Sequence, residues 1–137
     1  LTIEQTRSRP RKSNDNALVE GKNGSVIRKH MGYAYIPQRH AAAINCFYQA
    51  HFNAYVNFHR PSAYATTIRN EKGKEKKIYH LYETPYEHFK NLPGAASSLK
   101  DGVTLDLLDQ TAMAMNDLDC ATIMQKAKQN LFKSFRL

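Results

Sequence analysis

Apolar residues recur at helical spacing along residues 39–59, the strongest periodic pattern in the sequence. The positions that carry it are Ile44, Phe47, Tyr48, Phe52, Tyr55 and Val56. Side chains spaced in this way share one face of an α-helix, and that face packs against a core. Arg60 and Pro61 follow, and a proline interrupts a helix. The pattern therefore predicts an amphipathic helix over residues 39–59.

A weaker helical pattern precedes it. Val19, Val26 and Ile27 fall near one face of a helix predicted over residues 16–31. The Asx-rich residues 14–16 stand at its start, and Asx side chains accept hydrogen bonds from first-turn amides. We therefore expect these side chains to cap the helix.

Gly21 and Gly24 lie within one turn of this predicted helix. A glycine inside a helix costs roughly 1 kcal/mol relative to alanine. A close approach by another backbone would explain both glycines, and we expect one there.

Strand-like alternation appears on both sides of a charged turn that contains Gly73. Residues 64–69 and 77–82 alternate in this way and predict a β-hairpin. A short strand over residues 2–7 is also expected, followed by a loop over residues 8–13.

Helices are predicted after the hairpin. Thr84 followed by Pro85 is typical of a helix start, so a short helix should run to about Lys90. Residues 105–115 and 118–135 predict a helical pair. The apolar residues of this pair either pack on a core or dimerise; they include Met113, Met115, Met124, Leu131 and Phe135.

Composition excludes several classes of protein. The 137 residues are 42% hydrophobic and 23% charged, close to the globular average, which argues against wholesale disorder. No apolar run approaches the roughly 20 residues that span a bilayer. Cys46 and Cys120 are too few for a disulfide scaffold and match no zinc spacing. We expect a cytoplasmic protein.

The charge is strongly basic and unevenly placed. Lys and Arg number 20 against 12 acidic residues, and residues 1–90 hold 15 of the former and 7 of the latter. The candidate DNA-contacting cations are Arg7, Arg9, Arg11, Lys12, Lys22, Arg28 and Lys29. A second cluster consists of Lys72, Lys74, Lys76 and Lys77. Polyanion binding is one interpretation, and a solvated basic face that maintains solubility is the other.

Acidic residues are sparse among these cations. Glu20 is the one acid placed inside a predicted helix there, on a face shared with Asn23 and Gly24. A carboxylate beside a glycine suits a close approach by a phosphate backbone, although a surface glutamate would look the same. The six histidines contain no pair spaced for helical zinc binding.

Residues 6–23 resemble a known family. The run Thr6-Arg7-Ser8-Arg9-Pro10 and the pattern Asn14-Asp15-Asn16-Ala17-x-x-Glu20 are similar to the end of the catalytic core of bacterial insertion-sequence transposases. These are DDE enzymes of the retroviral-integrase type with an RNase H-like fold. The string Tyr55-Val56-Asn57-Phe58-His59-Arg60-Pro61-Ser62 also resembles the end of the last core helix in that family.

The resemblance implies a catalytic role and a metal. The family's Asp-Asn-Ala-x-x-Glu glutamate is the third catalytic acid, and Glu20 matches it. In the intact enzyme it would bind Mg²⁺ or Mn²⁺ together with two aspartates, which we expect upstream of Leu1. The absence of an initiator Met agrees with an excised C-terminal portion, and we expect this chain alone to be inactive.

These points combine into one expected organisation. The fold class is mainly α with a small β-hairpin: the C-terminal part of an RNase H-like α/β core with a helical extension. The expected divisions are residues 1–62 for the core, 63–91 for the hairpin and short helix, and 92–137 for a helical hairpin. DNA and a second copy of the chain are the expected partners, without a membrane. The alternative function is a non-enzymatic, basic nucleic-acid-binding or oligomerisation module.

Overall fold

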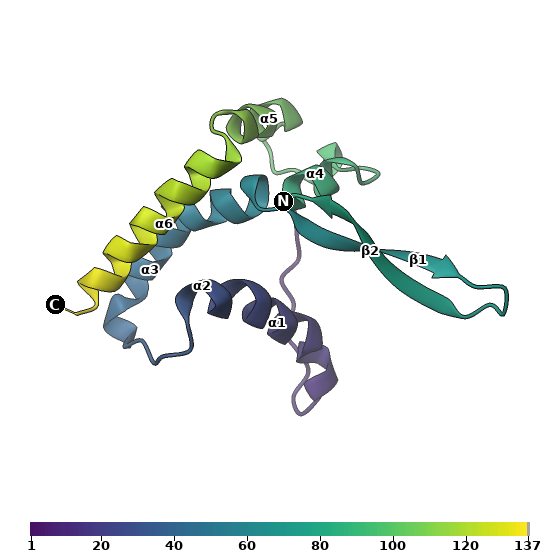
Figure 1. The fold of residues 1–137 in the computed structure, drawn as a ribbon, viewed down its shortest axis with the longest axis horizontal. Helices are drawn as coiled ribbons and strands as arrows, with labels where there is room; N and C mark the ends of the chain where they lie inside the picture. Colours follow the sequence, from purple (N-terminus) through teal and green to yellow (C-terminus); the bar gives the residue numbers. More distant parts are fainter. Residues whose placement is uncertain (137) are drawn as a thin grey trace. The chain divides into compact units, whose positions relative to one another are not determined.

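The computed structural model describes residues 1–136 and is mainly helical, with one two-stranded antiparallel sheet (Figure 1). The predicted mainly α class with a small hairpin is confirmed at this level. Two compact units are present: an N-terminal unit, Ile3–Gln38, and a C-terminal unit, Leu1–Thr2 with Arg39–Leu137. The expected divisions at residues 62 and 91 remain predictions.

The N-terminal unit contains one continuous run of helical turns, over residues 13–31. This run consists of a 3₁₀ turn Ser13–Asn16, α1 Ala17–Lys22, a π-helical stretch Asn23–Arg28 and α2 Lys29–Met31. Gly32 ends it with φ of 82°, a conformation that favours glycine. The helix predicted over residues 16–31 is confirmed.

Two expectations concern this part of the chain, and the expected strand is wrong. Residues 2–7 form no strand, because a strand needs a neighbour and Ile3 is 73% exposed. No atom outside their own helix lies within 4 Å of a side-chain carbon built at Gly21 or Gly24. Within the N-terminal unit, the expected close approach by another backbone is therefore not observed at either glycine.

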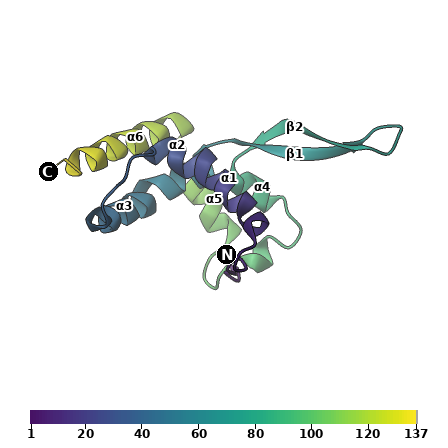
Figure 2. The same cartoon turned by 90° about the horizontal axis from the view of Figure 1, so that it is seen from below.

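The helix predicted over residues 39–59 is also confirmed. It runs through Gln38–His40, α3 Ala41–Phe47, Tyr48–Phe52 and Tyr55–His59, with π-helical turns in its second half. Phe47 and Phe52 are buried on the predicted apolar face. α6, Asp117–Ser134, packs along this helix (Figures 1 and 2).

The helical pair forms part of the core of the C-terminal unit. Met124 is 1% exposed and Leu131 is 8% exposed. Phe135 lies against the ring of His40, with 4.6 Å between the centroids. Met124 and Leu131 therefore pack on the core, because α3 and the helical turns of residues 48–59 supply the matching apolar face. Met113 and Met115 are 82% and 38% exposed, and dimerisation through them stays a prediction.

α4, Pro85–Lys90, and α5, Leu105–Met113, are joined through polar side chains. The Tyr86 hydroxyl donates to an Asp109 carboxylate oxygen at 2.6 Å, and Lys90 Nζ lies 2.7 Å from the other oxygen. These bonds hold the pKa of Asp109 below its usual value, mainly through the Lys90 hydrogen bond. Burial is the main cause that raises the pKa of Tyr86 to about 12, and the hydrogen bond with Asp109 is the second cause.

The sequence at the start of α4 fixes its first turn. Thr84 Oγ1 accepts from the Glu87 amide at 3.2 Å, and Glu87 accepts from the Thr84 amide at 2.8 Å. This reciprocal capping box satisfies amides that the helix leaves unbonded. A short 3₁₀ turn, Ala96–Ser98, lies between α4 and α5.

The hairpin joins β1, Ser62–Arg69, to β2, Glu75–Glu83, in antiparallel register. Thr66 pairs with Ile78 and Arg69 with Glu75, and one irregularity in β2 falls opposite Ala65. At its base Tyr64 stacks on His88 of α4, with centroids 3.7 Å apart. Beyond that base the hairpin extends away from the helices of its unit (Figures 1 and 2).

Candidate nucleic-acid interface

The loop before α1 is organised by one ion pair. Arg9 donates to Asp15 from its backbone amide at 3.1 Å, from Nε at 2.8 Å and from a terminal guanidinium nitrogen at 2.8 Å. This threefold contact closes the turn between them. Arg11 takes φ of 60° within it, a left-handed conformation that is uncommon outside glycine.

The expected Asx caps are not formed. Neither the 3₁₀ turn nor α1 has a side-chain hydrogen bond at its N-cap. The Asp15 carboxylate is directed to Arg9 instead, because a charged guanidinium binds a carboxylate more strongly than a neutral amide does. The Arg9 hydrogen bonds lower the pKa of Asp15 and raise that of Arg9.

Three of the predicted DNA-contacting cations surround one hollow. Arg9, Arg11 and Lys12 line it together with Ser13 and Asn14. Arg9 is paired with Asp15, so Arg11 and Lys12 supply the remaining positive charge there. The other members of the predicted set do not line this hollow: Arg7 precedes it, and Lys22, Arg28 and Lys29 follow along the helix.

All seven predicted cations of the N-terminal unit are exposed. Arg28 lies over the Tyr33 ring, 5.7 Å from its centroid, which is a cation–π arrangement. Lys22 and Lys29 form no ion pair among residues 1–136. The unit therefore presents an accessible basic surface.

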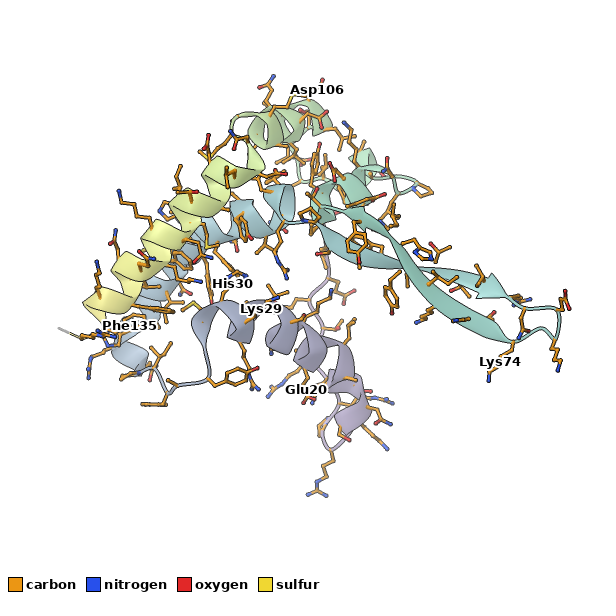
Figure 3. All side chains as sticks on the ribbon, in the orientation of Figure 1. Glu20, Lys29, His30, Lys74, Asp106 and Phe135 are labelled. Carbon is orange, nitrogen blue, oxygen red and sulfur yellow. The ribbon has the colours of Figure 1, made fainter. Side chains whose placement is uncertain are left out.

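Glu20 lies in the first turn of α1 and is exposed (Figure 3). Within residues 1–136 its carboxylate forms no ion pair and no side-chain hydrogen bond. The π-helical stretch begins three residues later, at Asn23, and contains Gly24. Glu20 therefore presents a free carboxylate beside a helix surface that carries no bulky side chain at Gly21 or Gly24.

The described residues do not by themselves make a two-cation site. Among them no group of three or more His, Cys, Asp or Glu side chains lies close enough to hold a metal ion. Glu20 would supply one oxygen-donor side chain, whereas a pair of catalytic cations is normally held by several carboxylates. The donor set in this chain is therefore incomplete for the implied Mg²⁺ or Mn²⁺.

Apolar side chains of the N-terminal unit lie open to solvent. Leu18 and Val19 are consecutive residues of α1, and they are 77% and 61% exposed. Tyr33 and Tyr35 are 80% and 88% exposed. Neighbouring apolar residues exposed on one element are typical of a surface that another polypeptide covers.

The second lysine cluster lies at the distal end of the hairpin. Lys72 and Lys74 belong to the turn, and Lys76 and Lys77 are the second and third residues of β2 (Figure 3 labels Lys74). The sequence signal for this cluster was the density of lysines alone. The sequence does not show that this turn extends away from the helices of its own unit, which the structure shows (Figure 1).

No protein-family model matches the chain, and no curated protein or solved structure matches it significantly. Within residues 1–136 no helix is long and apolar enough to cross a membrane. Both cysteines are free thiols, Cys46 exposed and Cys120 buried.

Proposed function

We propose that this chain is the C-terminal portion of a DDE transposase of the integrase type. The parent enzyme would cut and join DNA strands, and Glu20 would be the third of its catalytic acids. The observation that carries the proposal is the Asn14-Asp15-Asn16-Ala17-x-x-Glu20 pattern, which opens a helix with an exposed, unpaired glutamate. It matches the family pattern in both residue types and element.

The exposed apolar surface of α1 supports the same proposal. An RNase H-like core packs its helices against a sheet, and Leu18 and Val19 are the kind of side chains that such a sheet covers. Polypeptide outside residues 1–137 would provide that sheet and the two aspartates. The parent enzyme would work in the cytoplasm. It would be a homo-oligomer, because transposition joins two DNA ends.

The metal chemistry belongs to the assembled enzyme. Mg²⁺ or Mn²⁺ would polarise the phosphodiester and activate the attacking oxygen there. This chain would contribute the Glu20 carboxylate and a basic surface that positions the phosphate backbone. Contacts of that kind fix the orientation of DNA without reading its sequence.

A nicking assay tests the catalytic part. The purified 137-residue chain should leave supercoiled DNA intact with Mg²⁺ or Mn²⁺, because one carboxylate does not hold the cations. Glu20→Gln serves as the matched control, since it removes the charge and keeps the shape. Metal-dependent nicking that disappears in Glu20→Gln would show that the chain is an active nuclease by itself.

The coding sequence upstream of Leu1 tests the parentage. Two aspartates in RNase H-like strand context would support the proposal. A stop codon or an unrelated domain there would contradict it.

A non-enzymatic nucleic-acid-binding module is the second candidate. The specific observation in its favour is the hairpin lysine cluster, which needs no catalytic acid. Duplex binding by a chain whose gene encodes no upstream aspartates would select this candidate.

A further inference from the structure

The distal hairpin is the most densely cationic exposed element of the C-terminal unit. Residues 69–77 hold five Lys or Arg and two Glu. Arg69 is paired with Glu75 at 2.9 Å, which leaves the four lysines without an acidic partner in residues 1–136. The positive charge is therefore concentrated at one end of a projecting ribbon.

The turn that carries these lysines is rigidly bonded. Asn70 Oδ1 accepts from the amides of Lys72 and Lys74 at 3.1 and 2.8 Å, and the Asn70 carbonyl accepts from Gly73 at 2.9 Å. Gly73 has φ of 73°, a conformation that glycine adopts without strain. The cations at this turn thus start from a pre-organised backbone, which reduces the entropy lost on binding.

The base of the hairpin is held as well. Tyr64 stacks on His88 of α4, and His88 Nδ1 lies 3.3 Å from a Glu83 carboxylate oxygen. Both contacts tie the end of the ribbon nearest α4 to the helical core. The ribbon is consequently anchored at one end and free at the other (Figure 2).

We infer that the tip of the hairpin, residues 69–77, enters the major groove of duplex DNA as a two-stranded ribbon. The B-DNA major groove is about 12 Å wide and 8.5 Å deep, and it admits such a ribbon. At about 3.3 Å per residue, this depth corresponds to two or three residues along the ribbon, so it accommodates the turn and at most the pair nearest to it, Arg69 and Glu75. That part of the ribbon contains Lys72 and Lys74, while Lys76 and Lys77 would reach the phosphates at the groove edges.

Duplex DNA suits this shape better than a single strand. Single-strand binders track the backbone along a positively charged groove lined with aromatic platforms. Here the charge lies on a convex turn, and Tyr79 and Tyr82 lie nearer the base of the hairpin. This inference rests on the proposed function in one respect, which is that the polyanion bound by the hairpin is DNA.

The test compares two variants of the full chain that lose the same charge. The ribbon variant is Lys72→Gln, Lys74→Gln, Lys76→Gln and Lys77→Gln. The matched control is Lys100→Gln, Lys126→Gln, Lys133→Gln and Arg136→Gln. All eight positions are exposed, so neither variant should lose its fold, which circular dichroism checks.

Affinity for a 20-base-pair duplex is then measured by fluorescence anisotropy over a range of salt concentrations, with EDTA present. The ribbon variant should bind at least about tenfold more weakly near 0.1 M salt. The slope of its log–log salt dependence should fall by about 2–3, because each phosphate-neutralising lysine contributes about 0.9. The control variant should change affinity by less than about threefold.

Three outcomes would overturn the inference. The first is equal loss of affinity in both variants, which would indicate net charge alone. The second is unchanged affinity in the ribbon variant with increased aggregation, which would show that the lysines only protect the sheet edges. The third is binding to a single strand or heparin that is as tight as binding to the duplex and equally dependent on the four lysines.

Chemical protection locates the ribbon in the groove. Guanine N7 faces the major groove, so bound protein should protect it from dimethyl sulfate, and the ribbon variant should not. A bound duplex without N7 protection would rule out the groove placement. Because EDTA removes divalent cations, failure of this test is distinct from failure of the proposed strand chemistry, which the upstream coding sequence decides.

Discussion

The ion pair between Arg9 and Asp15 changes the role of two residues in the motif. Arg9 belongs to the predicted DNA-contacting set, and Asp15 to the predicted cap. In the structure Arg9 and Asp15 bind one another, and the Arg9 guanidinium donates to both oxygens of the Asp15 carboxylate. Asp15 therefore shapes the entry to α1 through the preceding loop rather than through the first-turn amides.

This pair makes the loop sensitive to acid. Because Arg9 stabilises the charged carboxylate, the folded pKa of Asp15 lies below its ordinary value. A lowered pKa contributes stability that is complete above the ordinary value and is lost as pH falls through the folded pKa. A carboxyl ¹³C titration by NMR should place the Asp15 midpoint below that of a model peptide.

The matched variant is Arg9→Gln, in which the Asp15 midpoint should rise toward the model-peptide value. An identical Asp15 midpoint in both proteins would mean that the pair does not form in solution.

At the scale of the elements, α5 and α6 carry similar apolar side chains, some of which are exposed and some buried. Met124 lies within α6 at 1% exposure, whereas Met113 ends α5 at 82% exposure. Both residues belong to the same apolar set in the sequence. The difference arises because only α6 lies along the helix of residues 38–59.

Paired substitutions measure that difference. Met124→Ala should lower the free energy of unfolding by about 2–5 kcal/mol, because it leaves a cavity in the core. Met113→Ala should change it by no more than about 0.5 kcal/mol, as is usual for an exposed position. Denaturant unfolding gives both values, and equal effects at the two sites would contradict the packing of α6.

At the scale of the whole molecule, apolar surface remains uncovered at the junction of α5 and α6. Met113, Met115 and Ile123 line a shallow hollow there, and Leu118 beside it is 76% exposed. Under the proposed transposase function an oligomer would hold two DNA ends, and we therefore expect a second copy of the chain to cover this surface.

Met113→Asp tests that expectation by placing a charge in the hollow. The mass measured by light scattering should fall from that of an oligomer to that of one chain. Circular dichroism should stay unchanged, since the site is exposed. A mass of one chain for the unaltered protein at every concentration would remove this surface as a self-association site.

The local elements could be predicted from the sequence because their signals are local. The spacing of Phe47 and Phe52 marks an apolar helix face, Thr84-Pro85 starts a helix, and alternation around Gly73 gives the hairpin. Each signal comes from residues within a few positions of one another, where backbone geometry fixes which side chains share a face. The predicted strand over residues 2–7 was wrong because a strand depends on a partner that the segment does not specify.

For the candidate site, the sequence located Glu20 and the cations but not their surroundings. The position of Glu20 within a helix follows from local pattern, and so does the abundance of Lys and Arg around it. The pairing of Arg9 with Asp15 does not, since other cations and the helix amides compete for the same carboxylate. Only the folded loop geometry selects among them.

The sequence by itself determined which segments are helical, where the hairpin turns, and that positive charge gathers in the first two thirds of the chain. The tertiary structure decided which apolar faces are covered: Met124 and Leu131 are buried, while Leu18, Val19 and Met113 are not. It also placed Lys72 and Lys74 on a turn that extends away from the helices of its unit, with Lys76 and Lys77 in the adjoining residues of β2. The reason is that the hydrophobic periodicity of a segment indicates on which face of its own helix or strand a side chain lies. Burial depends in addition on whether a segment distant in the sequence packs against that face.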